Sequence, residues 1–231
     1  MEELQSELCS VPSDNRARED AIARLFRQAG ASEVFFQTIG KQGYRNVYVI
    51  KRGRTDSIIV MGGHIDHVAK GDGVIDDWSG ACAASNVYQA LKSVETEHTL
   101  VFIGFAQEED GLIGSREFVR KLLEGERKRI RAMVNLECLG VGVTHIWSNG
   151  SDDALEAVVK RVAARDGIAL QEHTIAGVGA ITLDGLPVDR FELIHSEKDT
   201  CGNVSMSNYY DSYRLAVAFL LELDKTGALH E

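Results

Sequence analysis

The residues TLVFIGFAQEEDG, at positions 99–111, join an apolar run to three consecutive acidic side chains. A short apolar run of this kind is typical of a fully buried strand in a parallel sheet. Glu108 and Glu109 follow the run directly, where they have no structural purpose within a sheet. Neighbouring side chains diverge, so one carboxylate can bind a metal while the other accepts a proton from water. A solvated pair of loop residues is the alternative interpretation.

Four further fragments place a His or a carboxylate beside strand-like residues. They are GGHIDHV at 62–68, VIDDWSG at 74–80, VNLECLG at 134–140 and FELIHSEKDT at 191–200. Together with residues 105–111, these fragments supply two imidazoles, three further carboxylates and one additional Glu. Two divalent cations and a general base require about this set. We therefore predict a two-metal hydrolase site, although no single fragment would support that hypothesis.

Two of these fragments allow a structural as well as a functional interpretation. The Gly62-Gly63 pair favours a turn, in which Asp66 can accept the second imidazole N–H of His64 and fix its tautomer. His67, next to them, is an alternative ligand. The pair of carboxylates at 76–77 precedes a helix start, where acids commonly act as caps. A dication would relieve the repulsion within such a pair, whereas a cap would not.

The pattern of apolar residues predicts a single α/β domain over residues 1–231. We expect a three-layer αβα arrangement with a central mixed, mostly parallel sheet. Asp14 or Asn15 is expected to cap the first helix, which Gly30 ends. Expected strands cover residues 33–38, 46–51, 57–61, 99–106, 130–137, 143–147, 168–173 and 188–194. Further helices are expected at 79–94, 114–125, 152–166 and from 207 onward. The candidate residues then lie where strands stop, which is the usual ligand edge of such a sheet.

Composition restricts the possible partners and location. The formal net charge of −10 disfavours nucleic acid and anionic membrane as partners. The N-terminus lacks the pattern of a secretory signal, and no apolar run approaches about 18 residues, so we expect a cytoplasmic protein. The four cysteines form no CxxC pair and are expected to be free thiols.

The order HxD, DD-x-SG, EE-x-G-x-x-GS, NLE and IHSEKDT resembles the zinc aminopeptidase family of peptidase clan MH. That family includes bacterial leucyl aminopeptidases, aminopeptidase Y and glutaminyl cyclases. The resemblance covers roughly residues 58–200 and keeps both the order and the types of the residues. It differs in having Glu at position 137 where many aminopeptidases have Asp. The segment before the last histidine is not recognisable, so residues of the substrate pocket cannot be transferred.

The resemblance implies a role for each candidate residue. Two divalent cations, zinc or alternatively cobalt or manganese, would share a water that attacks the carbonyl. Glu108 would be the general base, and Asp66 would orient the metal-binding histidine. The implied metal ligands are Asp76, which bridges the two cations, His64 and Glu137 on one of them, and Glu109 and His195 on the other.

These features predict an aminopeptidase that removes the N-terminal residue of short peptides. We expect no inserted lid or protease-associated domain, because the chain has no room for one. A homo-oligomer is compatible with this expectation. One alternative is a cyclotransferase resembling glutaminyl cyclase, with one zinc and no attacking water. Carboxypeptidase and deacylase chemistry are further alternatives. A different class, a catalytically dead interaction module, is disfavoured because Glu108 and all five ligands are present.

Overall fold

A computed structural model gives the fold and describes residues 1–122, 124–147, 151–173 and 181–225. Its strands form one sheet in the order β1-β2-β4-β3-β5-β8-β6-β7. The strands are β1 Phe35–Ile39, β2 Tyr44–Lys51, β3 Ile58–His64, β4 Thr99–Phe105, β5 Ile130–Glu137, β6 His145–Trp147, β7 Gln171–His173 and β8 Ile181–Asp184. The helices are α1 Glu2–Cys9, α2 Asn15–Gln28, α3 Ser79–Leu91, α4 Ile113–Lys121, α5 Glu124–Arg127, α6 Asp153–Asp166 and α7 Met206–Lys225.

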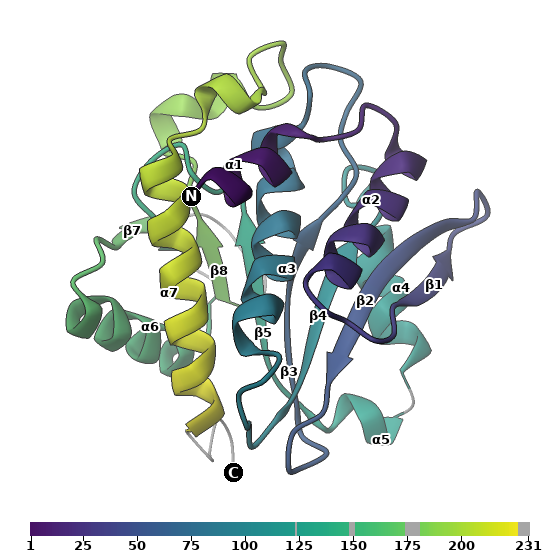
Figure 1. Cartoon of the computed structure of the whole chain (residues 1–231), viewed down its shortest axis with the longest axis vertical. Coiled ribbons are helices and arrows are strands. Elements are labelled where there is room, and N and C mark those ends of the chain that lie inside the picture. Colours follow the sequence, from purple (N-terminus) through teal and green to yellow (C-terminus); the bar gives the residue numbers. More distant parts are fainter. Residues whose placement is uncertain (123, 148–150, 174–180, 226–231) are drawn as a thin grey trace.

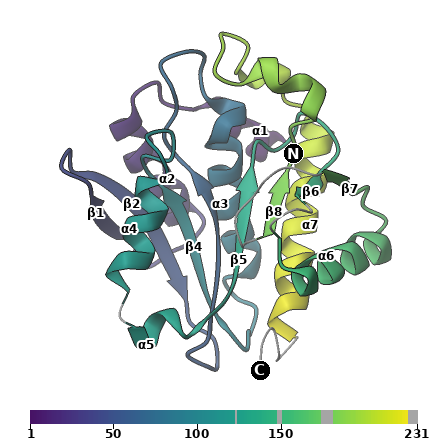
Figure 2. The ribbon, with the colours of Figure 1, turned by 180° about the vertical axis from the view of Figure 1, so that it is seen from behind.

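The sheet is mixed, with a parallel centre. Strands β4, β3, β5 and β8 run parallel to one another, while β1, β2 and β6 add antiparallel pairings toward the edges. Helices α2, α3 and α7 cover one face and α4 and α5 the other, as the two opposite views show (Figures 1 and 2). The expected three-layer α/β architecture is therefore confirmed. None of the helices in the described residues is both long and apolar enough to cross a bilayer.

Side chains alternate along each strand, so the two faces of the sheet carry separate hydrophobic cores. On β4, Leu100 and Phe102 join the large core that also includes side chains of α2, α3 and α7. Val101 and Ile103 point the other way, into a smaller cluster with Phe118 of α4. Since the side-chain period of a strand is two, one apolar run supplies both cores.

The helices begin and end largely where their sequences predict. The Asp14 side chain accepts a hydrogen bond from the Ala17 amide at 2.9 Å and so caps α2, as expected. Helix α3 is buried on almost all of its surface, because it lies centrally on the sheet with α2 and α7 on its sides. The N-terminal helix α1 was not anticipated. It is attached through Leu8, which is fully buried, and through the Trp78 indole, which donates to the Glu7 carbonyl at 3.3 Å.

Three expectations from the sequence are wrong. The Gly62-Gly63 pair does not form a turn, because both glycines lie within β3. Residues 188–194 do not form a strand, because a 3₁₀ helix, Val188–Leu193, begins directly after Pro187. The strand that pairs with β5 is instead β8, whose four residues are all buried. The cysteines are not all free, since Cys9 and Cys201 form a disulfide across a sequence separation of 192 residues. Cys82 and Cys138 are buried free thiols.

Candidate active site

His64 is the last residue of β3, and its ring is fixed from both sides. Its Nδ1 lies 3.0 Å from the main-chain carbonyl of Asp66, and its Nε2 lies 2.9 Å from Oδ1 of Asp76. The residue is only 3% exposed. A histidine held through Nδ1 in this way presents Nε2 as a ligand.

Asp66 differs from the sequence expectation in the atom that it offers to His64. Its carboxylate lies 3.8 Å from His64 Nδ1, whereas its main-chain carbonyl makes the short contact. The carboxylate instead accepts hydrogen bonds from the backbone amides of Glu108, at 3.0 Å, and Glu109, at 3.2 Å. These amides follow the last residue of β4 and have no partner in the sheet. Asp66 therefore positions the two glutamates as well as the histidine.

Asp76 lies at the centre of the site, between the two candidate histidines. Its Oδ1 faces His64, and its Oδ2 lies 3.1 Å from Nε2 of His195. The same His195 nitrogen is 3.1 Å from Oε2 of Glu109. Glu137 completes the other side, with Oε1 3.6 Å from His64 Nε2. All five predicted ligands thus meet around one carboxylate.

Glu108 lies beside this cluster, with Oε2 3.8 Å from His64 Nε2. Its side chain is 35% exposed, more than that of Asp76 or Glu137, so it faces the solvent side of the site. Glu137 is further oriented by Asn135, whose Nδ2 donates to Oε2 at 2.8 Å. Glu108 therefore stands at the open side of the cluster, and unlike Glu137 it belongs to none of the groups whose ligand atoms lie within 4.8 Å of one another in the described residues.

Asp77 is a structural residue of this site. Its carboxylate accepts hydrogen bonds from the backbone amides of His64, Gly80 and Cys138, at 3.1, 3.0 and 2.9 Å respectively. It thereby joins the ends of β3 and β5 to the start of α3. At Gly63, an added Cβ would lie 2.3 Å from the Asp77 carboxylate, and at Gly80 it would lie 2.5 Å from it. Only glycine leaves room for this carboxylate at both positions.

Two positioning residues were not found from the sequence. Asp199 is 1% exposed and accepts hydrogen bonds from the amides of Ile75, at 2.6 Å, and Asp76, at 3.3 Å. Arg18 is fully buried, and its guanidinium donates to the carbonyls of Ile65, at 3.3 Å, and Gly73, at 3.1 Å. It also donates to the carbonyls of Pro12 and Asp72. Both residues hold the loops that carry the ligands. An acid four residues after His195 in the quoted motif was the available signal for Asp199.

Unusual backbone conformations gather at the same place. Among the described non-glycine residues, those with positive φ are Gln107, Leu112, Cys138 and His195. Gln107 precedes Glu108, Cys138 follows Glu137, and His195 is itself a candidate ligand. Conformations of this kind are costly for residues with a Cβ and commonly mark functional sites.

The electrostatics of the site fit a divalent cation. Burial, helped by the charge of Asp76, raises the pKa of Glu109 to about 7. Burial also raises the pKa of Glu108, as do the neighbouring carboxylates, of which Glu137 has the largest effect. For His64, burial acts to lower the pKa, but hydrogen bonds to Asp76 and Glu137 hold it well above its usual value. The raised pKa values reflect the crowded negative charge of the site, which divalent cations would offset.

The donor atoms also suit metal binding. Ligand atoms of His64, Asp76 and Glu109 lie within 4.8 Å of one another, and so do those of His64, Asp77 and Glu137. Within the described residues, Oε1 of Glu109 is buried and has no hydrogen-bond partner. A nitrogen and oxygen set of this kind suits zinc and also accepts cobalt or manganese.

Within the described residues, the other histidines lie away from this cluster. His67 turns outward, with Nε2 3.0 Å from the carbonyl of Ser13, so it is not brought to the site as an alternative ligand. His98 lies 3.4 Å from Asp224, near the end of α7. His145 is buried 3.4 Å from Asp184 in the β6–β8 region.

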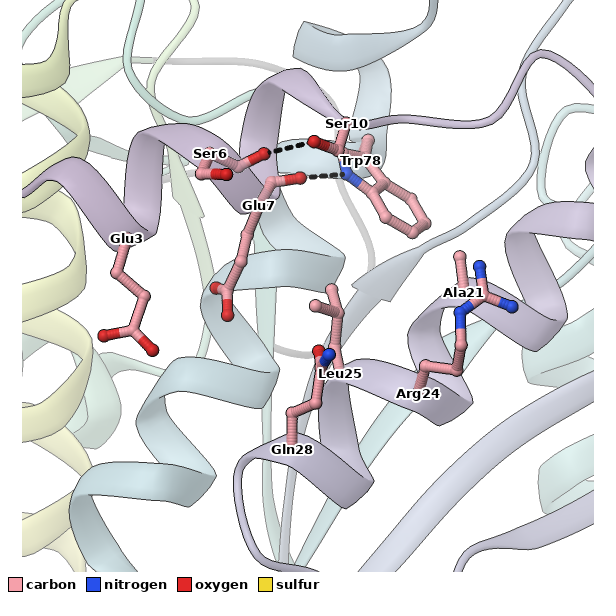
Figure 3. Close-up of a pocket in the computed structure, with 9 residues that line it drawn as sticks. All are labelled: Glu3, Ser6, Glu7, Ser10, Ala21, Arg24, Leu25, Gln28 and Trp78. Carbon is pink, nitrogen blue, oxygen red and sulfur yellow. Dashed lines mark hydrogen bonds between the residues drawn. The ribbon is translucent and has the colours of Figure 1, made fainter.

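Two hollows lie on opposite sides of the sheet. One, of about 800 Å³, is lined by His64, Glu108 and Glu137 and extends between α4 and β5. The other, of about 530 Å³, lies between α1, α2 and Trp78 (Figure 3). It contains Glu3, Glu7 and Arg24 but none of the predicted ligands. The first hollow, called the cleft below, is therefore the one that opens onto the candidate site.

Histidines and carboxylates gathered at the carboxyl ends of parallel strands are typical of metal-dependent hydrolases. Residues 46–220 match the profile of Peptidase family M28, so the chain belongs to that family. This confirms the resemblance inferred from the motifs. Aminopeptidase YwaD of Bacillus subtilis is 32% identical over 152 residues, which are 64% of this chain and 32% of that protein. The chain spans less than a third of the length of several curated relatives that it matches.

Solved structures share the fold. A zinc aminopeptidase from Bacillus subtilis has a TM-score of 0.73 and 22% identity, covering 80% of this chain and 51% of that chain. A glutaminyl cyclase from an Acidobacteriales bacterium has a TM-score of 0.78 and 17% identity. In that comparison 97% of this chain and 94% of the other are covered. At these identities the likeness concerns the fold alone.

Proposed function

We propose that this chain is a metal-dependent aminopeptidase that hydrolyses the N-terminal residue from short peptides. The observation that carries the proposal is the position of Asp76, whose two carboxylate oxygens face His64 on one side and His195 on the other. A carboxylate in this position can be shared by two cations. Membership of the M28 family and the similarity to curated aminopeptidases support the same function.

The proposed ligand sets follow from the contacts around Asp76. His64 and Glu137 would hold one cation and Glu109 and His195 the other, with Asp76 shared between them. The cations would be zinc or, with the same donors, cobalt or manganese. Cations held there would polarise the substrate carbonyl and lower the pKa of water.

Glu108 is proposed as the general base. Its carboxylate stands at the open side of the cluster, and burial raises its pKa toward the range in which a carboxylate can accept and return a proton. In hydrolysis it would take a proton from the attacking water and pass it to the leaving amine. Asp66 would serve as a positioning residue, since its carboxylate holds the amides of Glu108 and Glu109.

A glutaminyl-cyclase-like reaction is the second candidate, favoured by the near-complete mutual coverage with the cyclase fold. In that reaction the substrate's own N-terminal amine displaces the side-chain amide of glutamine and no water attacks. The full set of ligands on both sides of Asp76 favours the peptidase. The cyclase would need only one of the two metals.

The catalytic unit is proposed to comprise the whole chain without a lid, and a homo-oligomer would be compatible with it. A cytoplasmic location was expected from the sequence, but the Cys9–Cys201 disulfide weighs against it, because such bonds persist mainly in oxidising compartments. Mass spectrometry of the protein alkylated without reductant should leave Cys9 and Cys201 unmodified. Alkylation of both would favour the reducing cytoplasm.

The function is tested by metal content and by product. The zinc-reconstituted protein would be assayed for bound metal per chain and then given aminoacyl, N-acylated and N-terminal glutaminyl peptides, with and without chelator. Two metals and chelator-sensitive release of free N-terminal amino acids would support the aminopeptidase. One metal with a pyroglutamyl product would favour the cyclase, and an absence of metal and turnover would favour a non-catalytic module.

A further inference from the structure

The cleft beside Glu108 has a charge distribution that the metal centre does not explain. Apart from His64, Glu108 and Glu137, its charged lining residues in the described part of the chain are Arg116, Arg120 and Arg127. None of its remaining described lining residues is acidic. This is unusual for a chain with 35 acidic and 25 basic residues. The cleft therefore has a basic wall in an otherwise acidic protein.

Arg116 is the residue of this wall that is available for a ligand. Its guanidinium makes no ion pair or hydrogen bond with the described residues. Arg120, one helical turn later on α4, is engaged by Glu117 through two hydrogen bonds of 2.8 and 2.7 Å. Arg127 donates from Nε to the Leu122 carbonyl at 3.3 Å. Arg116 belongs to α4, which packs against β1 and β2 on the face of the sheet that Figure 2 shows.

The rest of the cleft is large and mainly apolar, with three uncharged polar residues, Ser115, Asn135 and Thr182, in its lining. Phe105, Leu112, Val119, Met133 and Trp147 line it, and its volume of about 800 Å³ lies toward the upper end of the range for ligand sites. This volume exceeds what one side chain fills. In an aminopeptidase only one residue precedes the bond that is cut, so the cleft suits the part of the peptide that follows that bond.

We infer that Arg116 binds a carboxylate of the substrate, located after the bond that is cut, so that the preferred substrates are short acidic peptides. The inference rests on the proposed peptidase function. Arginine is suited to this role because its planar guanidinium can bind a carboxylate through two parallel hydrogen bonds. The carboxylate can come from the free C-terminus of a very short peptide or from an Asp or Glu side chain. Either source has the same chemistry.

The test compares matched substrates that differ by one charge. Leu-Gly-Gly as free acid and as amide tests the C-terminus, and Leu-Glu-Gly amide with Leu-Gln-Gly amide tests the side chain. Glu-Gly-Gly amide with Gln-Gly-Gly amide places the charge before the bond instead. The zinc-reconstituted full chain would be assayed at low salt as wild type, Arg116→Ala and Arg116→Lys. Arg27→Ala, at an exposed arginine on α2 across the sheet, is the matched control.

For at least one of the first two pairs, the wild type should favour the charged peptide by about five- to tenfold in kcat/KM, since the arginine is partly solvated. Arg116→Ala should bring this ratio close to one, Arg116→Lys should retain part of it, and Arg27→Ala should keep it. Added salt should reduce the ratio, because solvated charges are screened. A general loss of structure would not change the ratio in this selective way.

Two results would overturn the inference. One is equal rates within the first two pairs in wild type, whether or not the third pair shows a charge effect. The other is a ratio that Arg116→Ala leaves intact. If no peptide is cleaved, the peptidase proposal fails. The proposed carboxylate site at Arg116 is then tested by measuring peptide binding. Calorimetry with zinc-loaded Glu108→Gln would then compare the acid and amide peptides. A preference for the acid that Arg116→Ala removes would sustain the site, and its absence would reject it.

Discussion

The two faces of the sheet differ in how completely they are covered. The face under α2, α3 and α7 carries one large, continuous core. On the face under α4, the second cluster has five buried side chains, and the cleft takes up the space beyond them. Strand β5 shows the difference within two residues, because Val134 is fully buried in the first core whereas Met133 is half-buried at the cleft. The closed face stabilises the sheet, and the incompletely covered face leaves room for a substrate.

Replacing the proposed base should have the largest effect, and it should affect activity alone. Glu108→Gln keeps the shape of the side chain but cannot accept a proton, so kcat should fall by about 10²- to 10⁴-fold. Bound zinc, measured by mass spectrometry, and the thermal midpoint should stay near wild type. Glu33→Gln, at an exposed position, is the control. Retention of activity in Glu108→Gln would remove the residue as the base.

The closed face should instead determine stability. Phe219 on α7 is fully buried in the large core, and Phe219→Ala should lower the free energy of unfolding by about 3–5 kcal/mol in urea titrations. Tyr210→Ala, on the same helix at a 39% exposed residue, should change it far less. Equal losses in the two variants would contradict a core centred on this face.

The loop that carries Asp76 can be tested through metal affinity. Asp199→Asn removes the charge that holds the amides of Ile75 and Asp76, so zinc affinity should fall by about 10- to 100-fold. Competition with a chelating indicator would measure this change. Asp189→Asn, at an exposed position, should leave the affinity unaltered. An unchanged affinity in Asp199→Asn would show that the ligand loop is held without it.

The smallest effect is expected at the floor of the cleft. Met133→Ala should cost only about 1 kcal/mol or less, because the side chain is already partly exposed. Val134→Ala removes fewer atoms but should cost more, about 2 kcal/mol, since Val134 is fully buried. Urea titrations of both variants give the comparison. A larger cost at Met133 would mean that the cleft face is packed as tightly as the other.

Much of the fold was predictable because its central strands are continuous apolar runs that end in chemically active residues. Strands β3, β4 and β5 were found in this way, and so were the residues that follow them. The short strand β8 was missed, and residues 188–194 were wrongly assigned as a strand. Four residues are too few for a pattern to separate a strand from a buried turn, and partners that decide the outcome lie far away in the sequence.

The candidate site was predictable as a set of residues, but its supporting contacts were not. The ligands occur in short motifs, whereas Arg18 reaches carbonyls 47 and 55 residues away, and Asp199 reaches amides more than 120 residues away. No local spacing reports such contacts. The Cys9–Cys201 bond belongs to the same group, since its formation depends on the docking of α1.

The buried carboxylate of Asp77 has a consequence for how the chain tolerates mutation. Gly63 and Gly80 approach it from two different elements, and an added methyl group at either position would collide with it. Neither glycine needs to contact a substrate or a metal. The main-chain carbonyl of Leu136 would also block an added Cβ, at 2.7 Å from Gly63 and 2.3 Å from Gly80. Random substitution should therefore find both positions as intolerant as the ligands themselves. The evolutionary constraint on the site therefore includes two glycines, at which any side chain would be too large.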